Sequence, residues 1–195
     1  MLDFDLKTKQ DRILAAALGC FKQYGFKRTS MDDIAKSSQV SRPALYLLFK
    51  NKTDIFRAIA KRFHEFTLVR AQGALKEEGP LSVRIENAII ARKRPLMALA
   101  FGSLHGPELF DTTLDIASDI NQDAQNTFSQ MIENVIAKGE QDGVLDLKTS
   151  KLTVAELTAL LNASAAGLKH HTHELEAYET LLRKSISVLL AGLTV

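Results

Sequence analysis

The sequence is poor in the residues that cross-link a fold or break its helices. The chain of 195 residues has a single cysteine, Cys20, so it cannot form an intrachain disulfide, which fits a reducing compartment. No apolar run approaches the ~18–20 residues that span a bilayer. The first ten residues are polar and include two aspartates, unlike a signal peptide. We therefore expect a cytoplasmic protein with no membrane partner.

Glycine and proline are also scarce, at 10 and 4 residues, and few β-branched runs alternate with a period of two. Apolar residues instead recur at intervals of three and four along nearly the whole chain, which is typical of helices with one buried face. A hydrophobic content of 46% is enough for a real core. The sequence therefore predicts an all-α fold.

Charge is divided unevenly along the chain. Residues 1–62 contain 13 Lys and Arg against 6 Asp and Glu, whereas residues 63–195 contain 12 against 17. A basic N-terminal part on an acidic body suits a protein that binds a polyanion at one end only. Chance clustering of surface charge is the alternative.

The basic part has the pattern of a helix-turn-helix. Thr8 and Asp11 predict a capping box at the start of a first helix, which Gly25 ends, with Phe26 folding back onto it. Two short helices follow, separated by a tight turn at 37–40. Ser30 with Asp33 caps the first of them. Ser41 caps the second, with Pro43 in its first turn.

The remainder predicts longer helices. One runs from Asn51 to about Glu78, and another begins at Leu81 and is kinked or ended by Pro95. One or two helices are expected in 111–142, a further helix from Thr153 to about Lys169, and a last one from about Glu176 to Gly192.

The segment from Thr8 to Phe63 resembles the DNA-binding region of the TetR family of transcriptional regulators. The residues that carry the resemblance are Ile13, Phe21, Gly25-Phe26, Thr29 to Ala35, Val40-Ser41, Leu45-Tyr46, Phe49, Lys52 and Ile55-Phe56. The rest of the chain matches only in helical outline. The sequence departs from the family at Gln39, where a turn glycine is usual, and at Pro43-Ala44 and Leu47-Leu48, which replace residues that are often polar.

The resemblance implies an N-terminal three-helix helix-turn-helix domain, at 1–52, followed by a helical ligand-binding and dimerisation domain, at 53–195. It implies a ligand-responsive transcriptional regulator, expected to be a repressor that binds a near-palindromic operator as a homodimer. No enzymatic activity, metal or cofactor is expected.

The helix after Ser41 would enter the major groove of double-stranded DNA. Arg42 would pair with guanine, Tyr46 would reach a phosphate, and apolar residues would contact thymine methyls. Lys52 resembles the family's phosphate-contacting lysine, although an ordinary solvated lysine is the alternative. The predicted DNA-binding residues are Arg28, Thr29, Ser30, Ser41, Arg42, Pro43, Ala44, Tyr46, Leu47 and Lys52.

The body would hold a small, mostly apolar ligand between its middle helices, with two histidines as polar anchors, although such residues are often plain core. The predicted ligand-binding residues are Phe63, His64, Phe66, Met97, Phe101, His105, Phe110, Phe128 and Met131. The last two helices suit a dimer interface in a four-helix bundle. The predicted interface residues are Leu157, Leu161, Ala165, Leu168, Leu182, Ile186 and Leu189.

Several alternatives remain open. His170, His171 and His173 are interpreted as solvated residues rather than metal ligands. The run 92–94, Arg-Lys-Arg, is interpreted as a solvated face, with contact to an anionic ligand as the alternative. A helical enzyme and a protein-binding adaptor without operator specificity are the rival functions. No nucleophile motif or phosphate-binding glycine loop supports the enzyme.

Overall fold

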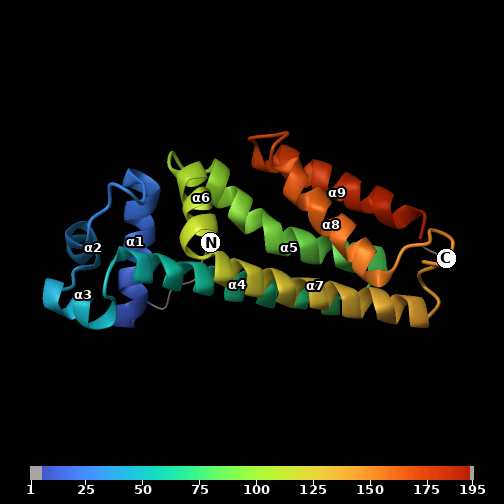
Figure 1. Ribbon diagram of the computed structural model, residues 1–195, viewed down its shortest axis with the longest axis horizontal. Helices are drawn as coiled ribbons and strands as arrows, with labels where there is room; N and C mark the ends of the chain where they lie inside the picture. The colour runs from blue at the N-terminus through green and yellow to red at the C-terminus, as the bar shows by residue number, and fades with distance from the viewer. Residues whose placement is uncertain (1–5, 194–195) are drawn as a thin grey trace. The chain divides into compact units, whose positions relative to one another are not determined.

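The computed structural model describes residues 6–193, without the side chain of Leu114, and within this range it contains helices and no strand. The predicted all-α fold is confirmed. The first five residues of the polar N-terminal segment lie outside the described range. The helices are α1 Lys9–Tyr24, α2 Met31–Ser38, α3 Arg42–Leu48, α4 Lys52–Lys76, α5 Leu81–Phe101, α6 Gly106–Ile116, α7 Ser118–Gln141, α8 Val154–Leu168 and α9 Leu175–Ala191 (Figure 1).

The helices pack into two compact units. The first contains the chain up to Phe66 together with Leu99–Asp123, and the second contains Thr67–Ala98 together with the chain from Ala124 onward. Helices α4, α5 and α7 each contribute residues to both units. The division into a DNA-binding domain at 1–52 and a ligand-binding and dimerisation domain at 53–195 stays a prediction.

The helix starts follow the capping signals in the sequence. The Thr8 hydroxyl accepts a hydrogen bond from the Asp11 N–H at 3.0 Å, and Ser30 with Asp33 forms a complete capping box. Thr153 and Glu156 form the same reciprocal arrangement at the start of α8. Each cap satisfies backbone donors that the first helical turn leaves unpaired.

Several helix boundaries differ from the sequence prediction, among them the start of α6 at Gly106 instead of within 111–142. Helix α2 continues through Ser38, because the Ser38 hydroxyl donates to the Ile34 carbonyl at 2.7 Å and Gln39 is the residue that leaves the helix, at φ 55°. Helix α5 continues past Pro95, so the proline does not end it, and the kink that the sequence predicts as the other outcome stays a prediction. Buried Met97 lies beyond the proline, so packing on that side can offset the cost of about 3 kcal/mol that a helical proline carries.

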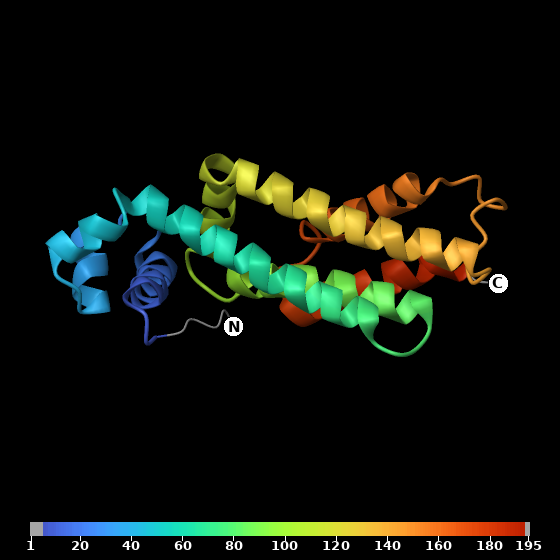
Figure 2. The same ribbon diagram turned by 90° about the horizontal axis from the view of Figure 1, so that it is seen from below.

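The core of the first unit lies between α1 and the helices that follow it. In both views α1, α2 and α3 lie together (Figures 1 and 2). Phe26 folds back as predicted: its ring centroid is 5.4 Å from Phe21 and 5.2 Å from Phe56. The remaining buried side chains of this core include Ile13, Leu14, Ala17, Ile34, Leu45, Phe49, Ile55 and Ile59.

The pair α8 and α9 in the second unit corrects the predicted dimer interface. Five of the predicted residues are at most 2% exposed and pack inside the chain: Leu157, Leu161, Ala165, Leu182 and Ile186. Leu168 and Leu189 are half-buried. The five buried positions are core residues of the protomer and leave little surface for a second copy, whereas Leu168 and Leu189 stay predicted interface residues.

The same pair buries Tyr178, whose hydroxyl donates to the Ala165 carbonyl at 3.0 Å. Burial raises the pKa of Tyr178 to about 12. The phenol therefore serves as a neutral hydrogen-bond donor inside this helix pair.

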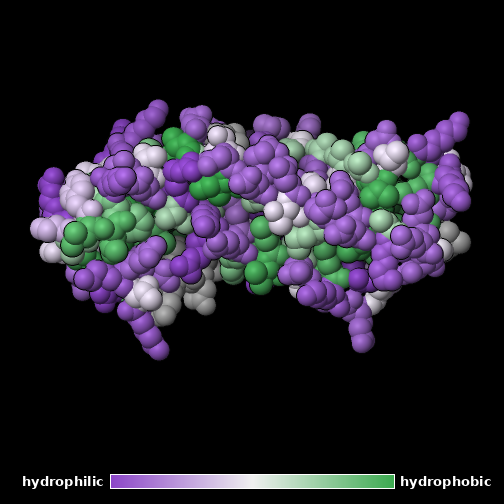
Figure 3. Space-filling view, turned by 60° about the horizontal axis from the view of Figure 1, so that its bottom comes forward, coloured by the Kyte–Doolittle hydropathy of each residue, from purple (hydrophilic) through white to green (hydrophobic). Residues whose placement is uncertain are grey.

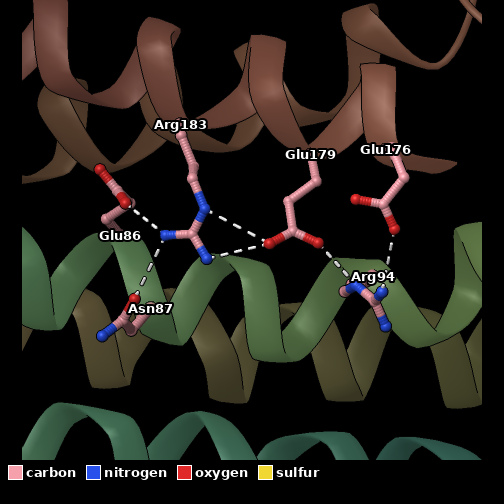
Figure 4. Close-up of polar contacts among 6 residues, drawn as sticks. All are labelled: Glu86, Asn87, Arg94, Glu176, Glu179 and Arg183. Carbon is pink, nitrogen blue, oxygen red and sulfur yellow. Dashed lines mark hydrogen bonds and ion pairs between the residues drawn. The ribbon is translucent and has the colours of Figure 1, made fainter.

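An ion network joins α5 to α9 (Figure 4). The Glu179 carboxylate accepts from Arg183 at 2.9 Å and from Arg94 at 2.6 Å, and Arg183 also contacts Glu86. Burial alone would raise the pKa of Glu179, but the two arginines outweigh it and lower the pKa. Glu176 lies at the edge of the network, 3.5 Å from Arg94 and 85% exposed.

The run 92–94 is not the solvated face that the sequence favours. Arg92 is only 5% exposed and Lys93 is half-buried, while Arg94 reaches the surface and joins the network with Glu179. Helical geometry points consecutive residues in different directions, so a run of like charges need not share one environment.

Within the described residues, no helix has the length and apolarity needed to cross a membrane. His170, His171 and His173 are all exposed, and no group of three or more potential metal ligands comes together in this part of the chain.

Replacing Glu179 with alanine should lower the free energy of unfolding by about 1–2 kcal/mol, because two arginines lose a shared, largely buried partner. Glu176→Ala is the matched control and should cost less than about 0.5 kcal/mol. Denaturation of both variants at neutral pH gives the comparison. Because the pKa of Glu179 is lowered in the folded protein, the cost should shrink as the pH falls below about 4. Equal costs for the two variants would contradict the network's role.

Candidate nucleic-acid interface

A tight turn sets the angle between α2 and α3. Gln39 takes a left-handed conformation, and the Val40 N–H returns to the Ala35 carbonyl at 3.1 Å. The Val40 side chain is buried, and the Ser41 hydroxyl then caps α3. Glycine adopts this left-handed conformation more readily than other residues, so glutamine here costs roughly 1 kcal/mol more than glycine would. The turn residue departs from the family pattern while its backbone geometry fits a helix-turn-helix.

Helix α3 presents one face to the core and the other outward. Leu45 is fully buried and Ala44 is half-buried, whereas Tyr46 is 41% exposed and Leu47 is 86% exposed. Ser41, Arg42 and Pro43 are also exposed. Hydrophobic residues interrupt the hydrophilic surface at the end of the first unit that carries α3 (Figure 3). The structure thus places most of the predicted base-reading residues together at an open surface.

Arg42 is already engaged at this surface. Its guanidinium lies 2.6 Å from the Asp32 carboxylate and 5.5 Å from the centre of the Tyr46 ring. Both partners of the ion pair are at least half exposed, so the pair is worth little in water and can exchange for a base or phosphate contact. A groove of about 450 Å³ adjoins it, lined by Asp32, Ala35, Lys36, Gln39, Val40, Ser41 and Arg42.

Lys52 has a different role from the one that the sequence suggests. Its ammonium donates to the carbonyls of Phe26, Lys27 and Thr29 at 2.8, 3.0 and 3.0 Å, and lies 4.7 Å from the Phe26 ring centre. An ammonium has three donors. All three are used, so the predicted direct phosphate contact is corrected: Lys52 ties the start of α4 to the segment between α1 and α2.

Thr29 also differs from its predicted role as a residue that contacts DNA. It is 1% exposed, and its hydroxyl donates to the Gly25 carbonyl at 2.7 Å, so the side chain holds the turn and does not face outward. Ser30 and Arg28 are exposed beside it, as a phosphate contact requires. The hydrogen bonds from Ser30 lower the pKa of Asp33, which keeps the capping carboxylate ionised.

Sequence reasoning missed Glu108, which helix α6 supplies. Its carboxylate accepts from the Lys27 N–H at 3.1 Å and lies 3.2 Å from the His105 ring. The hydrogen bond to the Lys27 backbone is the main cause that lowers the pKa of Glu108. Glycine is required at position 25, where φ is 82° and a Cβ would lie 2.4 Å from the Glu108 carboxylate. Lys27 and Glu108 are 81 positions apart, so no local sequence motif could have indicated this contact.

A second missed contact braces α4. Arg57 forms a bidentate pair with Asp119 at 2.6 and 2.7 Å and also donates to the Ile116 carbonyl at 2.8 Å. The hydrogen bonds from Arg57 are the main cause that lowers the pKa of Asp119 to about 2. The start of α7 is thereby attached to α4 within the first unit.

The predicted ligand-binding residues are divided between the two units. His64 is 7% exposed with its Nε2 atom 2.6 Å from the Asn121 side-chain oxygen, and five others of the first unit are half-buried: Phe63, Phe66, Phe101, His105 and Phe110. In the second unit Phe128 and Met97 are buried and Met131 is half-buried. A shared ligand cavity stays a prediction.

Comparison with known proteins supports the DNA-binding interpretation. Residues 13–59, which span α1 to the first part of α4, match the sequence model of the family described as bacterial regulatory proteins, tetR family. Residues 13–59 are therefore a TetR-family DNA-binding region. The segment that resembles the family in sequence is the one that builds the exposed α3 surface, and the relatives of the chain are named as transcriptional regulators.

Individual TetR-family relatives agree with this assignment. The chain is 44% identical over 59 residues to the regulator AcrR of Shigella flexneri, a match that covers 27% of each chain. It is 27% identical over 134 residues to the uncharacterized regulator YhgD of Bacillus subtilis, covering 68% of this chain and 67% of that protein. The chain thus spans about a quarter of AcrR, and the stronger identity is confined to the DNA-binding part.

The fold is shared over nearly the whole length with a solved TetR-family repressor. SmeT, the repressor of the Stenotrophomonas maltophilia multidrug efflux pump SmeDEF, superimposes with a TM-score of 0.71 at 18% identity, covering 98% of this chain and 93% of SmeT. An N-terminal helix-turn-helix followed by a helical body is therefore the architecture of this chain.

Replacing Lys52 with methionine should destabilise the N-terminal part by about 2–3 kcal/mol, because three carbonyls lose one charged donor. Lys50→Met, at an exposed lysine two positions earlier, should stay within about 0.5 kcal/mol of the wild type. Thermal unfolding gives the overall cost, and amide exchange of residues 26–30 should accelerate in the Lys52 variant alone. Unchanged exchange in that segment would show that the three hydrogen bonds do not hold it.

Proposed function

We propose that this protein is a ligand-responsive repressor that binds a near-palindromic operator as a homodimer. The observation that carries the proposal is the outer face of α3, where Arg42, Tyr46 and Leu47 are exposed on a helix whose inner face is fully buried. A rigid helix with a basic and apolar outer face suits the major groove.

Base reading is assigned to the start of α3. Arg42 would leave Asp32 for guanine, a contact worth roughly 1–3 kcal/mol of discrimination. Leu47, with Pro43 and Ala44, would contact thymine methyls. The limited number of polar groups on this face favours an operator in which a few guanines are set among A·T pairs.

Phosphate contacts are assigned to exposed groups on either side of that helix. Arg28 and Ser30 lie at the start of α2, where backbone donors and the helix dipole favour an anion. The Tyr46 hydroxyl would reach a phosphate on the other side. Lys52 supports these contacts indirectly, by fixing the segment that carries Arg28.

A second copy would meet the outer face of α8 and α9. That face carries small residues of α8 which are all exposed, namely Ala155, Ala159, Ala163 and Ala166, and exposed apolar residues with Leu160 at 43%, Leu181 at 39% and Val188 at 76%. Small residues allow two helices to approach closely, and isolated exposed leucines and valines gain most from being covered. Two copies would place two α3 helices on half-sites about 34–36 Å apart.

Regulation is assigned to a small molecule that shifts the balance between two separations of the α3 helices. Support comes from SmeT, which has also been solved with triclosan, and from the middle helices, whose residues Phe63, Phe66, Phe101 and Met131 are only half-buried in the free chain. A chromosomal operator also implies that the protein acts in the cytoplasm.

Operator selectivity should depend on Arg42. Fragments selected from random DNA by the wild type would define a preferred site, and Arg42→Ala should lose about 1–3 kcal/mol of discrimination at one base pair per half-site. Lys36→Ala, an exposed lysine of α2, is the control and should leave the preferred base unchanged. If the wild type enriches no sequence over random DNA, the proposed function is wrong.

Dimer formation should depend on the outer face of α8. Ala163→Arg should convert the dimer to a monomer, because it places two long charged side chains where the helices would touch. Asn134→Arg introduces the same charge at an exposed position of α7 and should leave the dimer intact. Light scattering after size exclusion measures both. A wild type that is monomeric, or a dimer that survives Ala163→Arg, would contradict this interface.

A further inference from the structure

Two cations of the second unit form no ion pair with an acidic side chain in the part of the chain that the structure describes. Arg92 is 5% exposed; one of its Nη atoms donates to the Thr67 hydroxyl at 2.7 Å, and its guanidinium lies 6.0 Å from the centre of the Phe128 ring. Its Nε atom is buried without a hydrogen-bond partner among the described residues. The ammonium of Lys93 donates to a neutral group, the Gln125 side-chain oxygen, at 3.3 Å.

Both cations reach the same turn of α7. Gln125 and Phe128 lie three positions apart on that helix, which places them on one face. The two side chains of α5 therefore converge on neighbouring positions, although they are consecutive in sequence. Burial raises the free energy of a charge steeply unless an opposite charge compensates it. Arg94, next along the chain, has such partners in Glu176 and Glu179, whereas Arg92 and Lys93 have none among residues 6–193.

Neutral polar groups continue from this point toward α8. The Gln125 amide donates to the Ser129 hydroxyl at 3.4 Å, and the Asn162 amide donates to the same hydroxyl at 3.2 Å. The side-chain oxygens of Asn162 and Thr158 are buried without partners among the described residues. Most buried polar groups in proteins are hydrogen-bonded. Three unmatched atoms in one unit, beside two uncompensated charges, indicate a site whose occupant is a separate molecule.

The pKa values of the two cations agree with a site for a bound molecule. Burial lowers the pKa of Arg92 to about 10. Burial also lowers the pKa of Lys93 to about 8, helped by the positive charges of Arg92 and Lys169. The charged groups that act on Lys93 are both cations: Arg92 beside it on α5 and Lys169 at the end of α8. An anion bound here would offset the free-energy cost of burying both positive charges.

We propose that Arg92 and Lys93 bind the acidic group of a small ligand, a carboxylate on an apolar body. The carboxylate would pair with the two cations, and Thr158 and Asn162 would bind a polar group further along the molecule. The apolar body would pack among the aliphatic and aromatic residues of this unit, such as Phe128 and Ile89. The proposal rests on the proposed ligand-responsive function and replaces a purely apolar ligand with an amphipathic anion.

The test uses matched pairs of probes on the full-length protein. The panel is octanoate, decanoate, dodecanoate and 1-naphthoate, each compared with the alcohol of the same skeleton, and calorimetry measures affinity. At least one carboxylate should bind on the order of tenfold more tightly than its alcohol, since the charged hydrogen bonds are absent from the alcohol. Equal binding within every pair, or no binding by any carboxylate, overturns the proposal.

The variants separate a binding role from a structural one. Arg92→Met and Lys93→Met should each weaken carboxylate binding by roughly tenfold or more without changing the affinity for the alcohol. Arg94→Gln, on the same helix, should change neither. If Arg92→Met fails to fold, Lys93→Met and the charge-retaining Arg92→Lys give the comparison. Carboxylate binding that survives the loss of either cation shows that these residues only support the core.

Two further measurements complete the experiment: the pH dependence of carboxylate affinity and the binding of the operator. Carboxylate affinity should fall as the pH rises through about 8 and Lys93 loses its proton, and this fall should be absent in Lys93→Met. A pH-independent affinity in the wild type would contradict a role for the Lys93 charge.

Binding to the selected operator is measured in parallel without any probe. Intact operator binding with no carboxylate effect defeats this inference alone, whereas loss of operator preference defeats the proposed function itself.

Discussion

The proposed DNA-binding surface depends on one ammonium group. Lys52 stands at the first position of α4 and holds three carbonyls of the segment that leads from α1 into α2. The segment has no secondary structure of its own, so its backbone acceptors must be satisfied from elsewhere. Because Arg28 and Ser30 lie in or next to this segment, and α3 follows from α2 through one fixed turn, the position of the outward face is set by this contact.

The first unit reinforces that arrangement from a distant part of the chain. The Glu108 carboxylate on α6 accepts a hydrogen bond from the Lys27 N–H, and Arg57 on α4 forms an ion pair with Asp119 at the start of α7. Thus both the N–H of Lys27 and its carbonyl are bound by charged side chains. A shift of α6 or α4 would move the start of α2 directly, so the proposed ligand control of DNA binding would have a physical route within the first unit.

The sequence predicted those features that depend on local chemistry. Capping pairs such as Ser30 with Asp33, the glycine at position 25 and the outward face of α3 all follow from residues a few positions apart. The same holds for the all-α fold, which periodicity alone indicates.

Features that depend on tertiary packing were predicted less well. The apolar stripe of α8 and α9 indicates a buried face but not whether a neighbouring helix or a second protomer covers it, and in the structure most of the stripe is already buried within the chain. Lys52 and Thr29 match the family pattern, yet their donors are consumed by backbone carbonyls. The burial of Arg92 beside the exposed Arg94 could not be read from a run of three like charges.

The central claim is that the outer face of α3, fixed by Lys52, is the surface that contacts DNA. Amide hydrogen exchange with and without the selected operator tests it most directly. The account predicts that DNA slows exchange in residues 41–48 and at the start of α2, and leaves α8 and α9 unchanged. Slower exchange confined to other helices, with residues 41–48 unaffected, would contradict it.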